Sequence, residues 1–292
     1  MIEWAIAARF SKPGTDETTD RGAVMFVDAA QRAAARVAYT ALIVALLAVG
    51  GAAHAAERGS VTHPGAVMEL FTSQACSSCP AADAVLADHA DRSDVLALAW
   101  HVDYWDYLGW RDTFGDPRHS LRQRRYAKAL GEGVYTPQLI VNGVLQGVGH
   151  RAADVERMLR LAGGAAVAGA EPFVPLAVKR AVRGYHVSLA GRPAERAEDA
   201  TLFLVWFDPR REVTIAGGEN DGRRMVYRNV VRGMQMLGSV LDGRLEVSPS
   251  DAALRPAGPQ GRSRAALVLQ RTEGGLPGAI LGAAVLGDVP AR

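Results

Sequence analysis

Residues 66–80 read Ala66-Val-Met-Glu-Leu-Phe71-Thr-Ser-Gln-Ala-Cys76-Ser-Ser-Cys79-Pro80, and this stretch decides the expected fold. The apolar run at residues 66–71 predicts a buried strand, and the apolar spacing over residues 80–90 predicts a helix. The chain has two cysteines, and both lie where the strand gives way to the helix. A C-x-x-C pair at such a junction is typical of a redox site.

The next eighty residues predict further strands and helices in alternation. The nearly continuous apolar run at residues 94–103 predicts a strand covered on both faces. A helix is predicted over residues 117–129, followed by a hairpin around Asn142-Gly143 and a closing helix over residues 151–161. This order of elements is similar to that of a minimal thioredoxin fold.

Three segments resemble a family of exported bacterial proteins that has a thioredoxin-like fold and is known as a domain of unknown function. They are residues 69–80, residues 101–110 (His-Val-Asp-Tyr-Trp-Asp-Tyr-Leu-Gly-Trp) and residues 136–143 (Thr-Pro-Gln-Leu-Ile-Val-Asn-Gly). The resemblance implies a fold and a compartment, but no reaction. It also implies that Pro137 follows a cis peptide bond and lies beside Cys76, whereas an ordinary X-Pro turn would be trans.

The two cysteines have separate expected roles because a thiolate, not a thiol, attacks a disulfide. The amides and the dipole of a helix N-terminus stabilise a thiolate, and Cys76 lies at that end. Cys76 is therefore the predicted nucleophile and Cys79, one turn later, the resolving thiol. A passive disulfide is the alternative, although so short a loop stabilises a fold little. A zinc site is disfavoured, since no second C-x-x-C or H-x-x-x-H motif occurs.

Three residues are candidates for binding the substrate. The backbone of Thr136 would pair with an extended peptide by strand addition. Trp105 and Trp110 belong to an aromatic cluster after the second strand, which predicts either an apolar groove for a peptide or packing within the loop. The basic residues between positions 118 and 128 are interpreted as a solvated helix face.

Three further residues are candidates for proton transfer or for tuning the thiols. Glu69 is an acid inside an apolar strand, so it predicts either a proton relay to Cys79 or an acid paired to an arginine. His101 and Asp103 lie at the C-terminal end of the second strand, where ligands gather in open α/β sheets. They predict a tuning pair, a metal site or hydrogen bonds to the following loop, and no metal is expected.

The N-terminal region predicts export. From Met25, which fits as the true start, the chain has Arg32 and Arg36 as a basic flank, an apolar run over residues 41–49 and the small-x-small site Ala53-His54-Ala55. Cleavage after Ala55 would give a periplasmic or secreted protein, whereas an uncleaved segment would be a membrane anchor. The formal net charge of +2 gives no footprint for nucleic acid.

The second half of the chain predicts β-structure. Residues 171–175, Glu-Pro-Phe-Val-Pro, predict a linker. Alternating apolar positions follow over residues 185–189, 202–206 and 213–215, and further strands are predicted over residues 265–270 and 278–286. Asn220-Asp221-Gly222 is interpreted as a hairpin turn. The expected fold class is an α/β thioredoxin-like domain followed by a mainly antiparallel β-sandwich-like domain. The expected boundaries are an extension with signal peptide over residues 1–55, the first domain over 56–170 and the second over 171–292.

The predicted function is an exported thiol-disulfide oxidoreductase that acts through Cys76 and Cys79, without a cofactor, on protein or small thiol substrates. Its partners would be protein or peptide thiols and disulfides, including a redox partner protein. The alternative is a binding module without turnover, either a metallochaperone that holds Cu(I) between the two sulfurs or a redox-inactive adaptor. The two uncharged serines leave the direction of electron flow open.

Overall fold

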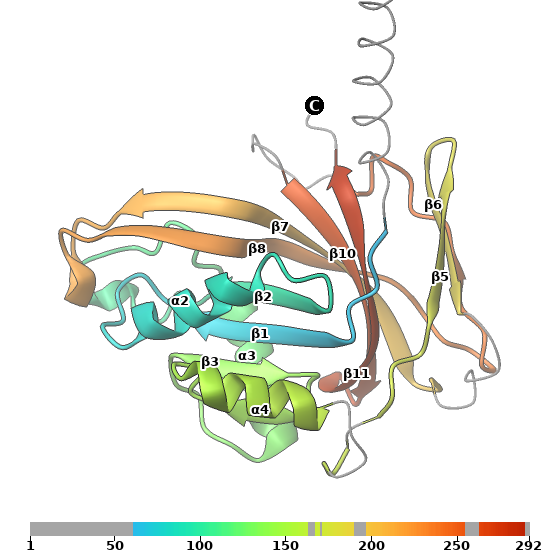
Figure 1. Cartoon of the computed structure of the whole chain (residues 1–292), viewed down its shortest axis with the longest axis horizontal. Coiled ribbons are helices and arrows are strands. Elements are labelled where there is room, and N and C mark those ends of the chain that lie inside the picture. The colour runs from blue at the N-terminus through green and yellow to red at the C-terminus, as the bar shows by residue number, and fades with distance from the viewer. Residues whose placement is uncertain (1–60, 163–166, 170, 190–196, 255–262, 290–292) are drawn as a thin grey trace, which may run out of the picture. The chain divides into compact units, whose positions relative to one another are not determined.

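A computed structural model describes residues 61–162, 167–169, 171–189, 197–254 and 263–289, which fall within one compact unit, Arg58–Arg292 (Figure 1). The expected export signal at residues 25–55 lies outside these residues, so cleavage and location stay predictions. Within the described part of the chain, no helix combines the length and the apolar character needed to span a bilayer.

The first half of the described chain has the predicted order of strands and helices. Strands β1 and β2 pair in parallel, and β3 joins the other edge of β1 in the antiparallel direction. All residues of β1 and β2 are buried, in agreement with their continuous apolar runs. The elements are β1 Ala66–Thr72, α2 Cys79–His89, β2 Val95–His101, α3 Pro117–Leu130, β3 Gln138–Val141, β4 Leu145–Gly147 and α4 Ala152–Ala162.

Helix α3 shows both expected end signals. Its first residue is Pro117, and the Asp116 side chain accepts a hydrogen bond from the backbone N–H of Arg118. The helix ends at Gly131, whose φ of 70° is a left-handed conformation that glycine adopts without strain.

The second half consists of strands. Four long antiparallel strands pair in the order β11-β10-β7-β8, and a smaller sheet pairs in the order β5-β6-β9. The long strands are β7 Ala200–Thr214, β8 Arg224–Ser239, β10 Ser263–Glu273 and β11 Leu276–Val289, and the small sheet comprises β5 Leu176–Ala181, β6 Gly184–Leu189 and β9 Glu246–Val247.

The two halves share one sheet. Strand β8 pairs in parallel with β2 at Ala99 and Val230, which gives the eight-stranded order β11-β10-β7-β8-β2-β1-β3-β4. The side-chain amide of Asn229 strengthens this junction by donating a hydrogen bond of 2.9 Å to the Ala97 carbonyl. The two segments therefore meet through backbone pairing and not only through side chains.

The expected fold class is wrong. An α/β thioredoxin-like domain followed by a separate β-sandwich would have two independent sheet systems, but the main sheet here is continuous and mixed. The described residues contain far more strand than helix, with three α-helices among them. Sequence periodicity detected most of the strands but not their partners, because an apolar strand such as β2 presents the same pattern whichever strand joins its free edge. The boundary expected at residue 170 stays a prediction.

Hydrophobic cores lie on both faces of the main sheet. Helix α2 packs on the face that carries Met68 and Leu70. Helix α3 packs through Tyr126 on the opposite face, against Val67 and Phe71. A further core joins the small sheet to the long strands, through residues that include Val187, Leu202, Leu204, Leu267 and Leu281.

Candidate redox site

The two cysteines form a disulfide at the turn between β1 and α2. Cys79 is the first residue of α2, and Ser78 is at the N-cap position before it. Ser77 and Ser78 are exposed, but Cys76 is only 1% exposed and Cys79 is fully buried. The site is therefore closed around its sulfur atoms in this state.

The segment before β3 lies against Cys76. The Thr136–Pro137 peptide bond is cis, and the Thr136 carbonyl oxygen lies 3.8 Å from Cys76 Sγ. The Ser78 hydroxyl donates to the same carbonyl at 3.4 Å. Pairing of β3 with β1 brings this segment to the cysteine turn, and the side-chain amide of Gln123 holds the preceding carbonyl, that of Tyr135, at 2.7 Å.

The two predicted tryptophans also reach this region. Trp105 Nε1 donates to the Thr136 hydroxyl at 2.7 Å, and Trp110 Nε1 donates to the Gln74 side-chain carbonyl at 2.8 Å. Tyr107 stacks on Trp105 and is 76% exposed. The structure thus brings Thr136, Trp105 and the cysteines together, with one aromatic ring open to solvent.

The tip of the β7–β8 hairpin, residues 215–223, covers the cysteine turn. The Asn220 side-chain amide donates to the carbonyls of Cys76 at 2.7 Å and Gln74 at 3.0 Å. The Glu219 carboxylate accepts the backbone N–H of Ser77 at 2.9 Å, and this hydrogen bond lowers the pKa of Glu219. Figure 1 shows the far end of β7 and β8 beside the start of α2.

The close packing of this tip on the cysteine turn explains why position 218 is a glycine. A Cβ on Gly218 would lie 3.0 Å from the Cβ of Ala75, and the φ of Gly218 is 73°. The sequence predicted only a hairpin turn at residues 220–222. A local sequence pattern cannot predict the contact of Asn220 with Cys76, because the two residues are 144 positions apart.

Asp83 is a buried acid that sequence reasoning missed. It follows Cys79 by four residues on α2, so the two side chains lie on the same face of the helix. Neither carboxyl oxygen has a hydrogen-bond partner within the described chain. Burial raises the pKa of Asp83 to about 7, although the nearby His101 imidazole opposes this shift. An acid among the apolar positions of the predicted helix was the available signal.

His101 belongs to the same buried region as Asp83. Its Nδ1 lies 2.8 Å from a carboxylate oxygen of Asp112, and both side chains are fully buried. Although burial acts to raise the pKa of Asp112, the neighbouring His101 imidazole and several hydrogen bonds hold it below its usual value. His101 Nε2 has no hydrogen-bond partner among the described residues.

Glu69 and Asp103 lie away from the sulfurs. Glu69 shares the strand face of Val67 and Phe71, opposite to the face that packs on α2. Its carboxylate accepts hydrogen bonds from Arg122 Nε at 2.8 Å and from the Tyr126 hydroxyl at 2.5 Å. The Asp103 carboxylate accepts the Ser120 hydroxyl at 2.5 Å. Glu69 is thus the arginine-paired acid of the two interpretations offered by the sequence.

The chain belongs to a protein family of unknown function, DUF1223, whose model matches residues 67–270. It is similar to the crystal structure of protein AGR_C_4864 from Agrobacterium tumefaciens, with 30% identity, a TM-score of 0.60 and coverage of 76% of this chain and 94% of that chain. HBP35 of Porphyromonas gingivalis matches with 14% identity and a TM-score of 0.48, over 77% of this chain and 75% of that chain. No curated protein sequence matches significantly. The comparisons assign a family but no reaction.

Proposed function

We propose that the protein is a thiol-disulfide oxidoreductase that acts through Cys76 and Cys79 on protein or peptide thiols and disulfides. The observation that carries the proposal is the position of the disulfide, at the start of α2 and against the Thr136 carbonyl, with an ionisable buried acid one helical turn behind Cys79. A passive bridge of this length would stabilise the fold little and would need no such acid. The proposal rests on this local arrangement and not on the fold of the whole sheet.

The reaction of the reduced protein with a substrate disulfide would take two steps. The Cys76 thiolate attacks one substrate sulfur, the substrate S–S bond breaks, and the leaving sulfur departs as a thiolate that takes a proton from solvent. The Asp83 carboxylate then accepts the proton of Cys79, whose thiolate attacks Cys76 Sγ and releases the second substrate sulfur. Two electrons pass from the protein to the substrate, and the reverse sequence oxidises a substrate dithiol.

The closed state adds a condition to this mechanism. Because Cys76 is 1% exposed, a substrate sulfur reaches it only when part of its cover moves. Thr136 and Trp105 would then line the entry, with the Thr136 backbone available to an extended peptide. An oxidising compartment outside the cytosol, as the N-terminal region predicts, would suit a stable disulfide of this kind and is part of the proposal.

The test uses the purified chain and oxidised glutathione. Cys79→Ser should accumulate a mixed disulfide at Cys76, seen by mass spectrometry, because the resolving thiol is missing. Cys76→Ser is the matched control and should react far less, since Cys79 is fully buried. Equal amounts of mixed disulfide in the two variants would refute the proposed division of roles. The same holds if folded Cys79→Ser forms no mixed disulfide although the urea-unfolded protein does.

A further inference from the structure

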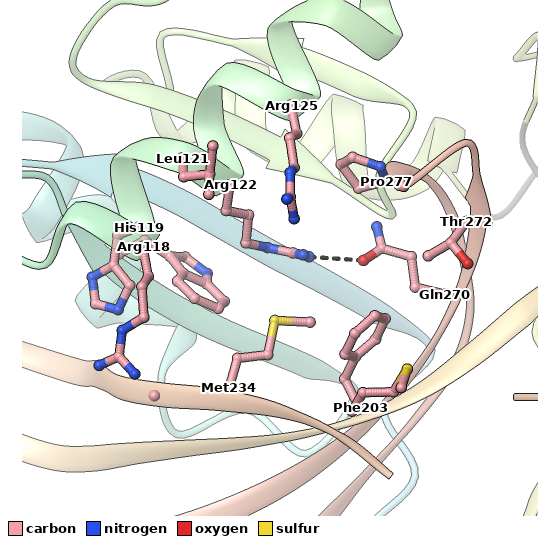
Figure 2. A pocket seen from close by; sticks show the side chains of 14 residues that line it. Arg118, His119, Leu121, Arg122, Arg125, Phe203, Met234, Gln270, Thr272 and Pro277 are labelled. Carbon is pink, nitrogen blue, oxygen red and sulfur yellow. Dashed lines mark hydrogen bonds between the residues drawn. The ribbon is translucent and has the colours of Figure 1, made fainter. Parts of the chain in front are cut away.

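A second site lies on the opposite face of the sheet from α2. A cavity of about 270 Å³ opens between α3 and the strands β7, β8 and β10 (Figure 2). Its volume lies just below the range of roughly 300–1,000 Å³ that is typical of small-molecule sites. The cavity is separate from the cysteine turn, and its lining contains none of the redox-site residues.

Apolar side chains form the floor and mouth of this cavity. Trp100, Phe203 and Met234 line it from three different strands. Leu121 and Met236 also line it and are 42% and 63% exposed, so apolar surface continues to the solvent. The apolar part of a ligand bound in this cavity would cover these side chains and remove their surface from water, which favours binding.

Arg122 is held rigidly at one wall. Its Nε and Nη2 donate to Glu69 at 2.8 and 2.9 Å, and Nη2 also donates to the Gln270 side-chain carbonyl at 2.9 Å. The guanidinium lies over the Trp100 ring, 5.1 Å from its centroid. Arg122 Nη1 has no hydrogen-bond partner among the described residues and is not sealed from solvent. A fixed guanidinium with a free donor group is a prepared site for an anion.

Arg125 supplies the net charge. It lies one turn after Arg122, is exposed, and makes no hydrogen bond or ion pair with the described part of the chain. Figure 2 shows both arginines extending from α3 toward Gln270. Glu69 neutralises Arg122, and Asp116 neutralises Arg118 at the other end of the cavity. The described lining contains no acidic residue, so about one positive charge is uncompensated.

We propose that this cavity binds a small amphipathic carboxylate, with the carboxylate on Arg122 Nη1 and Arg125 and the apolar body on Trp100, Phe203 and Met234. One uncompensated charge matches one monoanionic group. The guanidinium of Arg125, unpaired within the described chain, can pair with a carboxylate through its planar fork while Arg122 Nη1 donates a single hydrogen bond. The cavity volume limits the body to a short chain or a single ring system. This site is independent of the proposed thiol chemistry.

Calorimetric titration of the full chain with octanoate tests this inference. Arg125→Met should weaken octanoate binding by at least about tenfold, because a charge-assisted hydrogen bond is lost. Arg124→Met is the matched control, since Arg124 is exposed on the same helix but does not line the cavity, and it should leave binding unchanged. Octanol should bind far more weakly than octanoate. Met234→Glu, which places a carboxylate in the cavity, should abolish binding.

Several outcomes would overturn the inference. They are no octanoate binding at millimolar concentration, equal weakening by Arg124→Met and Arg125→Met, or equal affinity for octanol and octanoate. Tighter binding of octyl phosphate than of octanoate would overturn the carboxylate assignment. Circular dichroism of each variant ensures that a loss of binding is read only from folded protein.

Discussion

Asp83 is buried and has no hydrogen-bond partner in the described chain, and its pKa of about 7 lies above the usual 3.8. Between pH 4 and pH 7 the folded protein therefore keeps a proton that the unfolded chain has released. The free energy of unfolding should fall as pH rises through this window and level off above it.

Replacement of this acid should remove that pH dependence. In Asp83→Asn, the fall in the free energy of unfolding between pH 4.5 and pH 8 should be smaller than in the wild type by up to roughly 3 kcal/mol. Urea unfolding of the oxidised protein at both pH values measures the difference. Asp88→Asn, exposed on the same helix, should retain the wild-type dependence. An unchanged fall in Asp83→Asn would contradict the assigned proton.

Glu219 places a negative charge at the turn where a Cys76 thiolate would form. Its carboxylate also occupies the Ser77 N–H, which would otherwise be available to the thiolate. Glu219→Gln should therefore lower the pKa of the Cys76 thiol in the reduced protein. Absorbance of the thiolate at 240 nm across a pH series measures this pKa. Glu246→Gln on β9 serves as the control and should leave it unchanged. A raised pKa of the Cys76 thiol in Glu219→Gln would contradict this role of the Glu219 charge.

Among the elements, the β7–β8 tip has the clearest effect on the site because it closes the cysteine turn. Asn220→Ala removes its hydrogen bonds to the carbonyls of Cys76 and Gln74, so the tip should open more often. Reduction of the disulfide by a small phosphine should then become faster by about tenfold. Asp221→Ala, an exposed change in the same tip, is the control. Equal rates in Asn220→Ala and the wild type would mean that the tip does not limit access.

The elements also show what sequence could and could not predict. The apolar runs of β1 and β2 and the proline and glycine at the ends of α3 are local signals, and the corresponding elements are present. The cis bond at Pro137 was implied by resemblance and is present. The contact of Asn220 with Cys76 was not predictable, since hairpin-turn residues have the same sequence pattern whether or not the turn packs on another segment.

At the scale of the whole molecule, the continuous sheet predicts one cooperative unit. The β2–β8 pairing joins the halves, and Arg122 connects β1 to β10 through Glu69 and Gln270. Urea unfolding should therefore follow a single transition, with coincident curves from far-ultraviolet circular dichroism and tryptophan fluorescence. Trp206→Phe, which removes a fluorophore of the second half, should give the same midpoint by both probes. Two separated transitions would support the two-domain organisation expected from sequence.

The sheet as a whole shows why the fold class was mispredicted. The Pro-containing segment at residues 171–175 and the change to alternating strands both suggested a second domain with its own sheet. Pairing partners are set by tertiary contacts, and strands β7 and β8 are long enough to serve the small-sheet core, the α3 core and the cysteine turn together. Composition and periodicity therefore cannot predict that the same two strands contribute to several parts of the structure.

The 144 positions that separate Asn220 from Cys76 have a consequence during synthesis. A ribosome makes the two thiols long before it makes the hairpin tip that closes over them. A nascent chain that stops before residue 215 therefore lacks the part of the cover that the hairpin tip supplies to the cysteine turn. The cysteine pair can become as buried as it is in the finished molecule only after the ribosome has made the hairpin tip.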